Sequence, residues 1–436
     1  MTHLPLKRLP PSLQTGHSTA ALVGTALASG LLAVLLSRNF FEYEKKISQL
    51  IETDYGIADP PFSRTVSHLL GPPLMEGNAI DILQNGDEIF PAMLQAIRSA
   101  KRSVTMENFV FEEGIVSDQF AVAMAEQANA GVKVHFLQDA MGCNCLHGSA
   151  MKVMKQAGVE VEIFRYLHFT QFNERTHRKL LIIDGKVGFI GGVGISDAWL
   201  GNGDKANKWR DTQYRVEGPV VAQLQQAFMD NWLQTRACVL HGDDYFPSLT
   251  PAGSITAQGF LSSACEGADS ARLMFLFSIA AARKTIRIAN AFFIPDDLMI
   301  RTLVAAAKRG VQIEVIAPSD LNDQHLARLV GRSRWRSLYK VGVRFYEFQK
   351  ALFHCKYMIV DECWTSVGSC NLDNRSLRLN DEANLNILDN HFATRHVETF
   401  ERDKAASAEI SFQEWKHRRW REKISGHLGN VLRSQM

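Results

Sequence analysis

The sequence predicts an α/β fold built from two similar halves, and two observations support this. The segments HRKLLIID (177–184) and HCKYMIVD (354–361) place His, Lys and Asp at identical intervals. A glycine-containing segment follows each at the same distance, GGVG (191–194) after the first and GSCN (368–371) after the second. The repeat therefore extends beyond a single motif and indicates an internal duplication.

Upstream of each motif the expected elements come in one order. A helix ending in basic residues leads into a strand, and a second helix leads into a strand that begins with glycine. The segments are 96–111, 119–130 and 131–139 in the first half, and 279–294, 298–309 and 310–318 in the second. Alternating helices and strands predict helices packed on a sheet.

Composition and spacing also predict how the chain is divided. A stretch rich in Gly, Ser, Pro and Ala separates the two halves, as a linker does. We expect a leader (1–19), an apolar anchor (20–37), a first half (76–240), a linker (241–265), a second half (266–405) and a basic amphipathic tail (406–436).

The anchor is predicted from a stretch without Lys, Arg, Asp or Glu that runs from Pro10 to Ser37. A helix of about 20 apolar residues spans a bilayer, and residues 20–37 are just long enough. A cleaved signal peptide is the alternative, because Ala26-Leu27-Ala28 resembles a cleavage site. The apolar run continues beyond Ala28, which favours a retained transmembrane helix. Basic residues nearly balance on its two sides, so charge does not fix its orientation.

The bulk composition excludes several classes of protein. With 46% hydrophobic and 22% charged residues the chain is not globally disordered, and its net charge of +2 is not that of a general polyanion binder. The seven cysteines are an odd, scattered set, and Cys143-x-Cys145 lacks a second pair at zinc-site spacing. We therefore expect reduced thiols, which is weak evidence for a cytoplasmic location, and no metal site.

The spacing within each motif points to phosphate chemistry. Residues two apart in a strand share a face, so His177 and Lys179 lie together while Asp184 turns toward a structural partner. His354, Lys356 and Asp361 repeat the pattern. An Asp-Gly turn would explain Asp184, but Asp361 is followed by Glu, and turn chemistry leaves both His-Lys pairs unexplained. If the halves meet, two imidazoles supply a nucleophile and a general acid, and two ammonium groups stabilise phosphate without a metal.

At these residues the sequence resembles the phospholipase D superfamily, whose H-x-K-x4-D signature occurs twice per active site. The resemblance covers roughly residues 80–405. It is greatest to bacterial cardiolipin synthases, in HRKLLIIDGKVGFIGG (177–192), WRDTQYRVEGPVV (209–221), FFIPDD (292–297) and GSCNLDNRSLRLNDEANLNI (368–387). The resemblance implies two α/β sandwich halves, mixed sheets flanked by helices, related by a pseudo-two-fold with a composite active site between them.

The resemblance also implies roles for single residues. His177 attacks phosphorus and carries the phosphatidyl group, and His354 protonates the departing alcohol and activates the incoming one. Lys179, Lys356 and Asn371 hold the non-bridging oxygens, with Ser369 beside them. Asp211 and Glu382 are candidate partners for the imidazoles, with surface carboxylates as the alternative. Asp184 and Asp361 complete the catalytic motifs.

The chain departs from the family pattern at one position. Such enzymes usually carry Asn in both halves, whereas the first half has Gly194. We expect either that Ser196 replaces the missing donor or that the site is asymmetric, with glycine present because of a close approach. Losing an oxyanion-type donor typically costs about 10²–10³ in rate.

Features outside the motifs suggest contacts with substrate and membrane. Glu107, aligned with Asn290, either lines the pocket mouth or is an ordinary strand residue. The segment WKHRRWREK (415–423) fits an interfacial helix on anionic lipid. A basic-aromatic cluster either meets lipid head groups or covers a solvated helix face, and it comprises Arg332, Arg334, Trp335 and Arg336.

These observations predict a membrane-anchored phosphatidyltransferase that makes cardiolipin. Its expected partners are phospholipids, such as phosphatidylglycerol, and the membrane surface, and no cofactor is expected. The expected location is a bacterial inner membrane, with the cytoplasmic side favoured for the catalytic domain. A hydrolytic phospholipase D is the nearest alternative, and an inactive lipid-binding homologue is another. A nuclease agrees less well with the near-neutral charge.

Overall fold

The computed structural model describes residues 24–25, 29–30, 47–143, 148–164, 174–263 and 270–429. Residues 1–43 and 44–436 are separate compact units. The predicted leader and anchor belong to the first unit and lie outside the described residues, apart from 24–25 and 29–30. Among the described residues, none of the helices is both long and apolar enough to cross a membrane.

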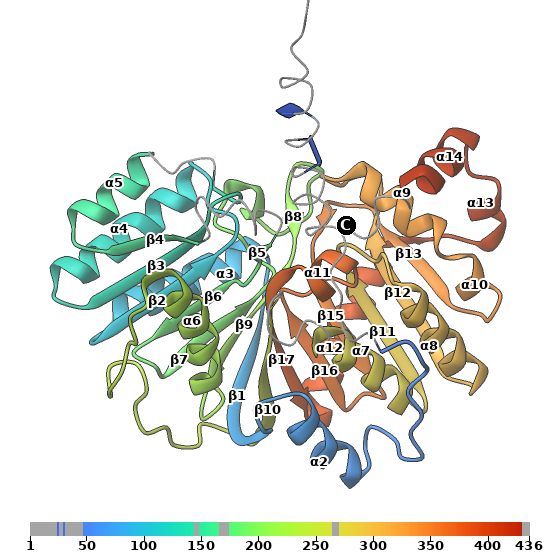
Figure 1. The fold of residues 1–436 in the computed structure, drawn as a ribbon, viewed down its shortest axis with the longest axis horizontal. Coiled ribbons are helices and arrows are strands. Elements are labelled where there is room, and N and C mark those ends of the chain that lie inside the picture. The colour runs from blue at the N-terminus through green and yellow to red at the C-terminus, as the bar shows by residue number, and fades with distance from the viewer. Residues whose placement is uncertain are drawn as a thin grey trace, which may run out of the picture. The chain divides into compact units, whose positions relative to one another are not determined.

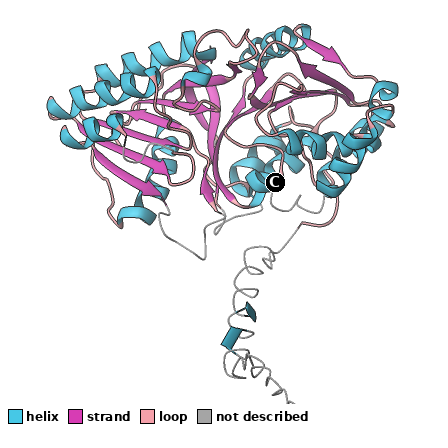
Figure 2. Ribbon diagram, turned by 90° about the horizontal axis from the view of Figure 1, so that it is seen from above, coloured by secondary structure: helices cyan, strands magenta, loops and turns pink. Residues whose placement is uncertain are grey.

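The second unit has the predicted α/β fold, a large mixed sheet flanked by helices (Figure 1, Figure 2). One side of the sheet runs, from the centre outward, through β1 (Met75–Gln84), β9 (Thr212–Glu217), β7 (Val187–Gly191), β6 (Leu180–Ile183), β2 (Ser103–Asn108), β3 (Lys133–Asp139) and β4 (Glu160–Phe164). The other side runs through β10 (Ile255–Ser262), β17 (Asn380–Leu388), β16 (Trp364–Gly368), β15 (Lys356–Val360), β11 (Thr285–Asn290), β12 (Gln312–Pro318), β13 (Arg344–Phe348) and β18 (Ser407–Glu409).

The two sides use the same order of strands. β2, β3 and β4 are parallel, as are β11, β12 and β13, and the strands between them and the centre are antiparallel. β1 and β10 pair antiparallel and join the sides (Figure 1). The duplication read from the motifs thus extends to the strand order of the sheet.

Helices cover the sheet. α4 (Ile115–Asn129) and α8 (Asp297–Lys308) precede the second parallel strand of each side and match the predicted helices 119–130 and 298–309. α3 (Asn85–Ser99) and α7 (Ser270–Ala281) precede the first parallel strand and lie mostly upstream of the predicted segments 96–111 and 279–294. The remaining described helices are α2 (Pro60–Leu69), α5 (Ser149–Gln156), α6 (Val221–Arg236), the 3-10 helix η1 (Asp197–Trp199), α9 (His325–Ser333), α10 (Arg336–Tyr339), α11 (Asn374–Arg378), α12 (Asn390–Ala405), α13 (Phe412–Lys416) and α14 (Trp420–Gly429).

Three large apolar clusters hold these layers together, since burial of apolar surface is the main driving force of folding. One contains Phe90 of α3 and Phe120 of α4 in the first half, and another contains Phe277 and Trp335 in the second half. The third includes residues of both halves, among them Trp232 of α6 and those of β15 to β17. Apolar packing therefore connects the halves around the centre of the sheet.

The predicted linker contains part of that centre. Residues 241–254 form neither helix nor strand, and residues 255–262 form β10. β10 lies between β1 and β17 with partners on both edges. The small and polar residues of segment 241–265 predict a linker, although residues 255–262 form a strand that is paired on both edges.

Candidate active site

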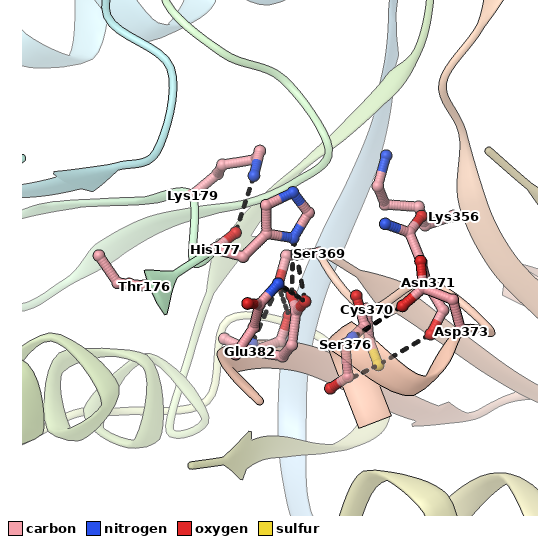
Figure 3. A network of polar contacts seen from close by, with 12 residues as sticks. Thr176, His177, Lys179, Lys356, Ser369, Cys370, Asn371, Asp373, Ser376 and Glu382 are labelled. Atoms are coloured by element: carbon pink, nitrogen blue, oxygen red, sulfur yellow. Dashed lines mark hydrogen bonds and ion pairs between the residues drawn. The ribbon is translucent and has the colours of Figure 1, made fainter. Parts of the chain in front are cut away.

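The first motif histidine is positioned by the second half of the chain. The two-residue strand β5 (Arg175–Thr176) pairs in parallel with the start of β17. His177 lies just after β5, and its backbone N–H donates to the carbonyl oxygen of Asp381 at 2.8 Å. Its Nδ1 lies 3.0 Å from both carboxylate oxygens of Glu382 (Figure 3). Glu382 thus engages Nδ1 and leaves Nε2 as the nitrogen for chemistry.

The second motif histidine is positioned in the same way by the first half. The short strand β14 (Leu352–Phe353) pairs in parallel with β8 (Trp209–Arg210). The backbone N–H of His354 donates to the carbonyl oxygen of Arg210 at 2.8 Å. Its Nδ1 lies 2.7 Å from Oδ2 of Asp211. The carboxylates predicted as imidazole partners are therefore the ones found, each contributed by the half opposite its histidine.

The expectation that His and Lys share one strand face is wrong in detail. Residues 177–179 lie between β5 and β6, and His354 lies between β14 and β15. A regular strand would continue straight past the other half. The interruption at each histidine lets the segment pair first with a strand of the opposite half, through β5 or β14, and then enter the sheet of its own half as β6 or β15.

The two motif lysines are buried beside the histidines. Nζ of Lys179 donates to the carbonyl oxygen of His177 at 2.7 Å, and Nζ of Lys356 donates to that of His354 at 2.6 Å. The ends of the two lysine side chains lie on either side of the imidazole of His177 in Figure 3. Burial lowers the pKa of Lys179 to about 7 and also lowers the pKa of Lys356. A bound anion would restore the charge of both groups, because an opposite charge nearby favours the ionised form.

The imidazoles are also shifted by their surroundings. Burial lowers the pKa of His177 and is opposed by the charge of Glu382. Burial, reinforced by the charge of Lys356, lowers the pKa of His354 to about 3 despite the carboxylate of Asp211. Both rings are therefore neutral near pH 7, the form in which a histidine is a nucleophile or a base.

The two motif aspartates lie in turns rather than beside the histidines. Asp184 has a φ of 53° and Asp361 a φ of 52°, at the hairpins β6–β7 and β15–β16. The carboxylate of Asp184 accepts from three successive backbone N–H groups of residues 101–103 at 2.7–3.1 Å. That of Asp361 accepts from residues 283–285 at 2.7–2.8 Å. Each aspartate ties its hairpin to the start of the neighbouring strand, the structural role expected from its parity.

A pocket of about 480 Å³ opens beside His177. Its size is in the range of small-molecule sites, about 300–1,000 Å³. The wall combines polar and apolar groups. The lining residues are Phe109, Met141, Arg175, His177, Phe292, Ile294, Gln324, Ala327, Asn371, Asp373, Arg375, Ser376 and Asn380.

The predicted supporting residues of the second half lie in this region. Asn371 is 4% exposed and lines the pocket. The hydroxyl of Ser369 donates to Oε2 of Glu382 at 2.5 Å (Figure 3). Ser369 therefore fixes the carboxylate that holds His177.

Close packing explains the glycine at position 194. A Cβ there would lie 2.7 Å from Cβ of Val110 and 3.0 Å from ring atoms of Trp199. The alternative, that Ser196 replaces the missing amide, is wrong. The Ser196 hydroxyl donates to Glu112 at 2.6 Å and accepts from the N–H of Ala198, so it is engaged away from the histidines.

The suggestion that Glu107 lines the pocket mouth is wrong, because its side chain is fully buried beneath the site. It accepts hydrogen bonds from the hydroxyl of Thr176 and from Nδ2 of Asn231. Asp139, which sequence reasoning missed, accepts from the backbone N–H of Thr176 at 3.0 Å. Two buried carboxylates thus hold the residue that precedes His177. In the sequence, Glu107 is marked by its alignment with Asn290, whereas nothing marks Asp139, which ends the mixed polar and apolar strand β3.

The basic-aromatic cluster is largely internal. Arg332 and Trp335 are buried, and Arg332 pairs with the buried Glu347 at 2.9 Å. Of the two tail tryptophans, Trp415 is 6% exposed and donates to the carbonyl oxygen of Arg332, whereas Trp420 is 66% exposed. The lipid-facing interpretation is therefore wrong for Arg332, Trp335 and Trp415.

The fold and the doubled His-Lys pair define a phospholipase D-like protein. The family model described as "Cardiolipin synthase, PLD-like domain" matches residues 93–232 and 276–404, one motif in each match. The chain belongs to this family.

Similar proteins agree with this assignment. The chain is 34% identical to the probable cardiolipin synthase YwiE of Bacillus subtilis, over 76% of this chain and 67% of that one. It is 31% identical to cardiolipin synthase A of Pseudomonas fluorescens, over 78% and 72%. Phosphatidylserine synthase from Haemophilus influenzae shares the fold, with a TM-score of 0.67 over 86% of this chain and 99% of that one at 13% identity.

Proposed function

We propose that this protein is a cardiolipin synthase-like phosphatidyltransferase that works through a phosphohistidine. The observation that carries the proposal is the crossed pairing, His177 with Glu382 and His354 with Asp211, at 3.0 and 2.7 Å. Because each half holds the other half's histidine, the halves supply one composite site. The relatives named cardiolipin synthase support phospholipids as substrates.

The reaction runs in two displacements. Nε2 of His177 attacks phosphorus of the donor lipid, the bond from phosphorus to the leaving alcohol oxygen breaks, and His354 gives that oxygen a proton. A hydroxyl of the acceptor lipid then attacks phosphorus and yields its proton to His354 as the phosphorus–nitrogen bond breaks. With phosphatidylglycerol as donor and acceptor, the products are cardiolipin and glycerol.

The charges of the site suit both steps. A neutral His177 can attack, and a neutral His354 can take the proton of the acceptor. The first step needs His354 protonated, and an anionic phosphodiester bound beside it raises its pKa. Lys179, Lys356 and Asn371 hold the non-bridging oxygens, where negative charge accumulates.

The domain organisation follows from the same model. We place the halves at 76–240 and 266–405, joined through 241–265 and related by a pseudo-two-fold. The matching strand order of the two sides supports two halves, with β10, at the end of the joining segment, as the counterpart of β1.

We also place the enzyme on a bacterial inner membrane, through the anchor at 20–37 and the tail. In the tail Trp420 and Ile424, one helical turn apart in α14, are 66% and 49% exposed. Leu326 of α9 is 40% exposed, and the next residue, Ala327, lines the pocket. An exposed apolar group near the pocket suits an enzyme that draws its substrate from a bilayer.

The decisive experiment incubates the purified full-length protein with phosphatidylglycerol vesicles labelled in the glycerol head group and in the acyl chains. Acyl label in cardiolipin together with released glycerol supports the transferase. Phosphatidic acid with equimolar glycerol would indicate a hydrolase instead. No turnover, with vesicle binding retained, would indicate an inactive lipid-binding homologue.

A further inference from the structure

The two carboxylates that hold the histidines are themselves held differently. Glu382 accepts from the hydroxyl of Ser369 at 2.5 Å. The position equivalent to Ser369 in the first half is Gly192, where a Cβ would lie 2.4 Å from Oδ1 of Asp211. A serine cannot support Asp211 from that position, so its support must come from elsewhere.

The indole of Trp199 supplies this support. Its Nε1–H donates to Oδ2 of Asp211 at 3.1 Å, the oxygen that lies 2.7 Å from Nδ1 of His354. The backbone N–H of Thr212 donates to the other oxygen at 2.8 Å. Asp211 is therefore fully engaged and presents a fixed acceptor to Nδ1 of His354.

The same indole shields the ring of His354. Trp199 is 1% exposed, and its ring meets His354 edge to face, with centroids 5.4 Å apart. Trp209 lies against both rings, with its centroid 4.2 Å from that of Trp199 and 4.9 Å from that of His354. A dry surround strengthens the hydrogen bond between Asp211 and His354.

Two features of the residues near Trp199 in the sequence fix the position of its indole. Gly194 leaves the space, since its Cβ would lie 3.0 Å from the benzo ring of Trp199. Asp197 at the start of η1 accepts from the backbone N–H groups of Ile115 and Val116 at 3.1 and 2.9 Å, which ties η1 to α4. The glycine and the tryptophan thus form one structural unit.

We propose that Trp199 is a positioning residue for His354, and that Gly194, at the position equivalent to Asn371, makes room for it. Where the second half has an amide, the first half has a glycine beside an indole that fixes the opposite histidine. Asp211 thereby holds the Nδ1–H tautomer of His354 and leaves Nε2 for the substrate. Nζ of Lys356, 3.0 Å from Nδ1, is the charged group that faces the same nitrogen. The proposal rests on the proposed function only in taking His354 as the proton-transfer group.

The first test measures the histidine without turnover. Nitrogen-15 NMR of the full-length protein labelled in histidine, with His354→Gln to assign the resonance, reports tautomer and titration of the ring. We expect the Nδ1–H form in the wild type. In Trp199→Phe we expect a mixed tautomer and a titration shifted to higher pH, because an Asp211 that has lost its donor attracts the imidazolium more strongly. An unchanged tautomer and titration in Trp199→Phe would overturn the proposal.

The second test measures transfer with labelled phosphatidylglycerol. Trp199→Phe should lower kcat about ten-fold with KM within two-fold, and should move the pH profile of kcat to higher pH. Trp232→Phe is the matched control, an equally buried tryptophan with no hydrogen-bond partner for Nε1 in the described structure, and it should leave the profile in place. Equal effects of the two substitutions would count against a positioning role.

A double-mutant comparison of kcat tests whether Gly194 and Trp199 act together. Gly194→Ala should lower kcat in the wild type and lower it less in the Trp199→Phe background, because the smaller ring removes the contact with Trp199 and leaves only that with Val110. Strictly multiplicative losses would refute the pairing. If wild type and variants alike lack transferase activity, the proposed function fails, while the NMR result still decides the role of Trp199.

Discussion

At the scale of single residues, the site depends on buried ionisable groups whose partners come from distant parts of the sequence. Glu382 is 1% exposed and Asp211 fully buried, and each has a lowered pKa because the adjacent histidine, with a lysine behind it, favours the ionised form over the cost of burial. A carboxylate held ionised in this way orients an imidazole without competing for the proton.

Replacing the two histidines should have different effects on turnover and on formation of the phosphoenzyme. His177→Ala should abolish turnover and leave no labelled phosphoenzyme, because the nucleophile is gone. His354→Ala should lower the rate by at least about 10²–10⁴, the range for a lost acid–base group, while a phosphoenzyme can still form slowly. Acid-quenched single turnovers with labelled lipid provide the measurement. Substantial activity in either variant would contradict a shared site.

Glu107 should make stability depend on pH. Burial raises its pKa from 4.5 to about 7, so the folded state binds its proton more tightly than the unfolded state does. This contribution is fully present below about pH 4.5 and is lost as the pH rises through 7, an effect of up to about 3 kcal/mol. Glu107→Gln should therefore narrow the difference in Tm between pH 5.5 and pH 8. Calorimetry checks this, with the exposed Glu76→Gln as control; equal narrowing in both variants would disprove it.

At the scale of elements, short strands and tight turns connect the motifs to the sheet. β5 with β17 and β14 with β8 are the pairings that bring each histidine to the opposite carboxylate. The hairpins that follow place an aspartate at positive φ, which Asp tolerates better than most residues.

The aspartate of the first hairpin should matter more for stability than for chemistry. Asp184→Ala removes the acceptor of three backbone N–H groups and should cost about 2–4 kcal/mol. Asp184→Asn keeps an acceptor and tolerates positive φ, so its cost should be smaller. Urea unfolding and the kcat of the folded fraction are to be compared. A kcat lost in Asp184→Asn with stability intact would show that the residue acts in catalysis.

At the scale of the whole molecule, a continuous sheet and an apolar cluster shared by both halves fix the site at their junction. In the proposed mechanism, Lys179 and Lys356, one from each half, carry the positive charge needed at phosphate. We therefore expect chelators to leave transfer intact. Loss of activity in EDTA with recovery on adding a divalent ion would disprove this.

The apolar segment 20–37 should remain in the mature protein. Its apolar run continues past Ala28, the one cleavage-like site, so we expect the protein extracted from membranes to keep its N-terminus. Intact-mass spectrometry decides the question. A mature chain beginning at Ser29 would rule out the anchor.

The sequence by itself determined the repeated motifs, the α/β class and the family, and it predicted the residues that the proposed mechanism uses. Spacing sufficed for His177, Lys179, His354 and Lys356, because a local repeat survives in the order of the residues. The resemblance to known enzymes also indicated Asp211 and Glu382 as candidate partners of the imidazoles.

Only the tertiary structure decided which groups meet across the halves. That Glu382 holds His177, that β10 is a central strand, and that Trp199 fills the space left by Gly194 depend on contacts between residues far apart in the chain. Burial decided that Arg332 and Trp415 face inward although their segments are basic. A sequence records local pattern directly, whereas pairing between distant strands and the packing of one ring on another appear only when the sheet has closed around them.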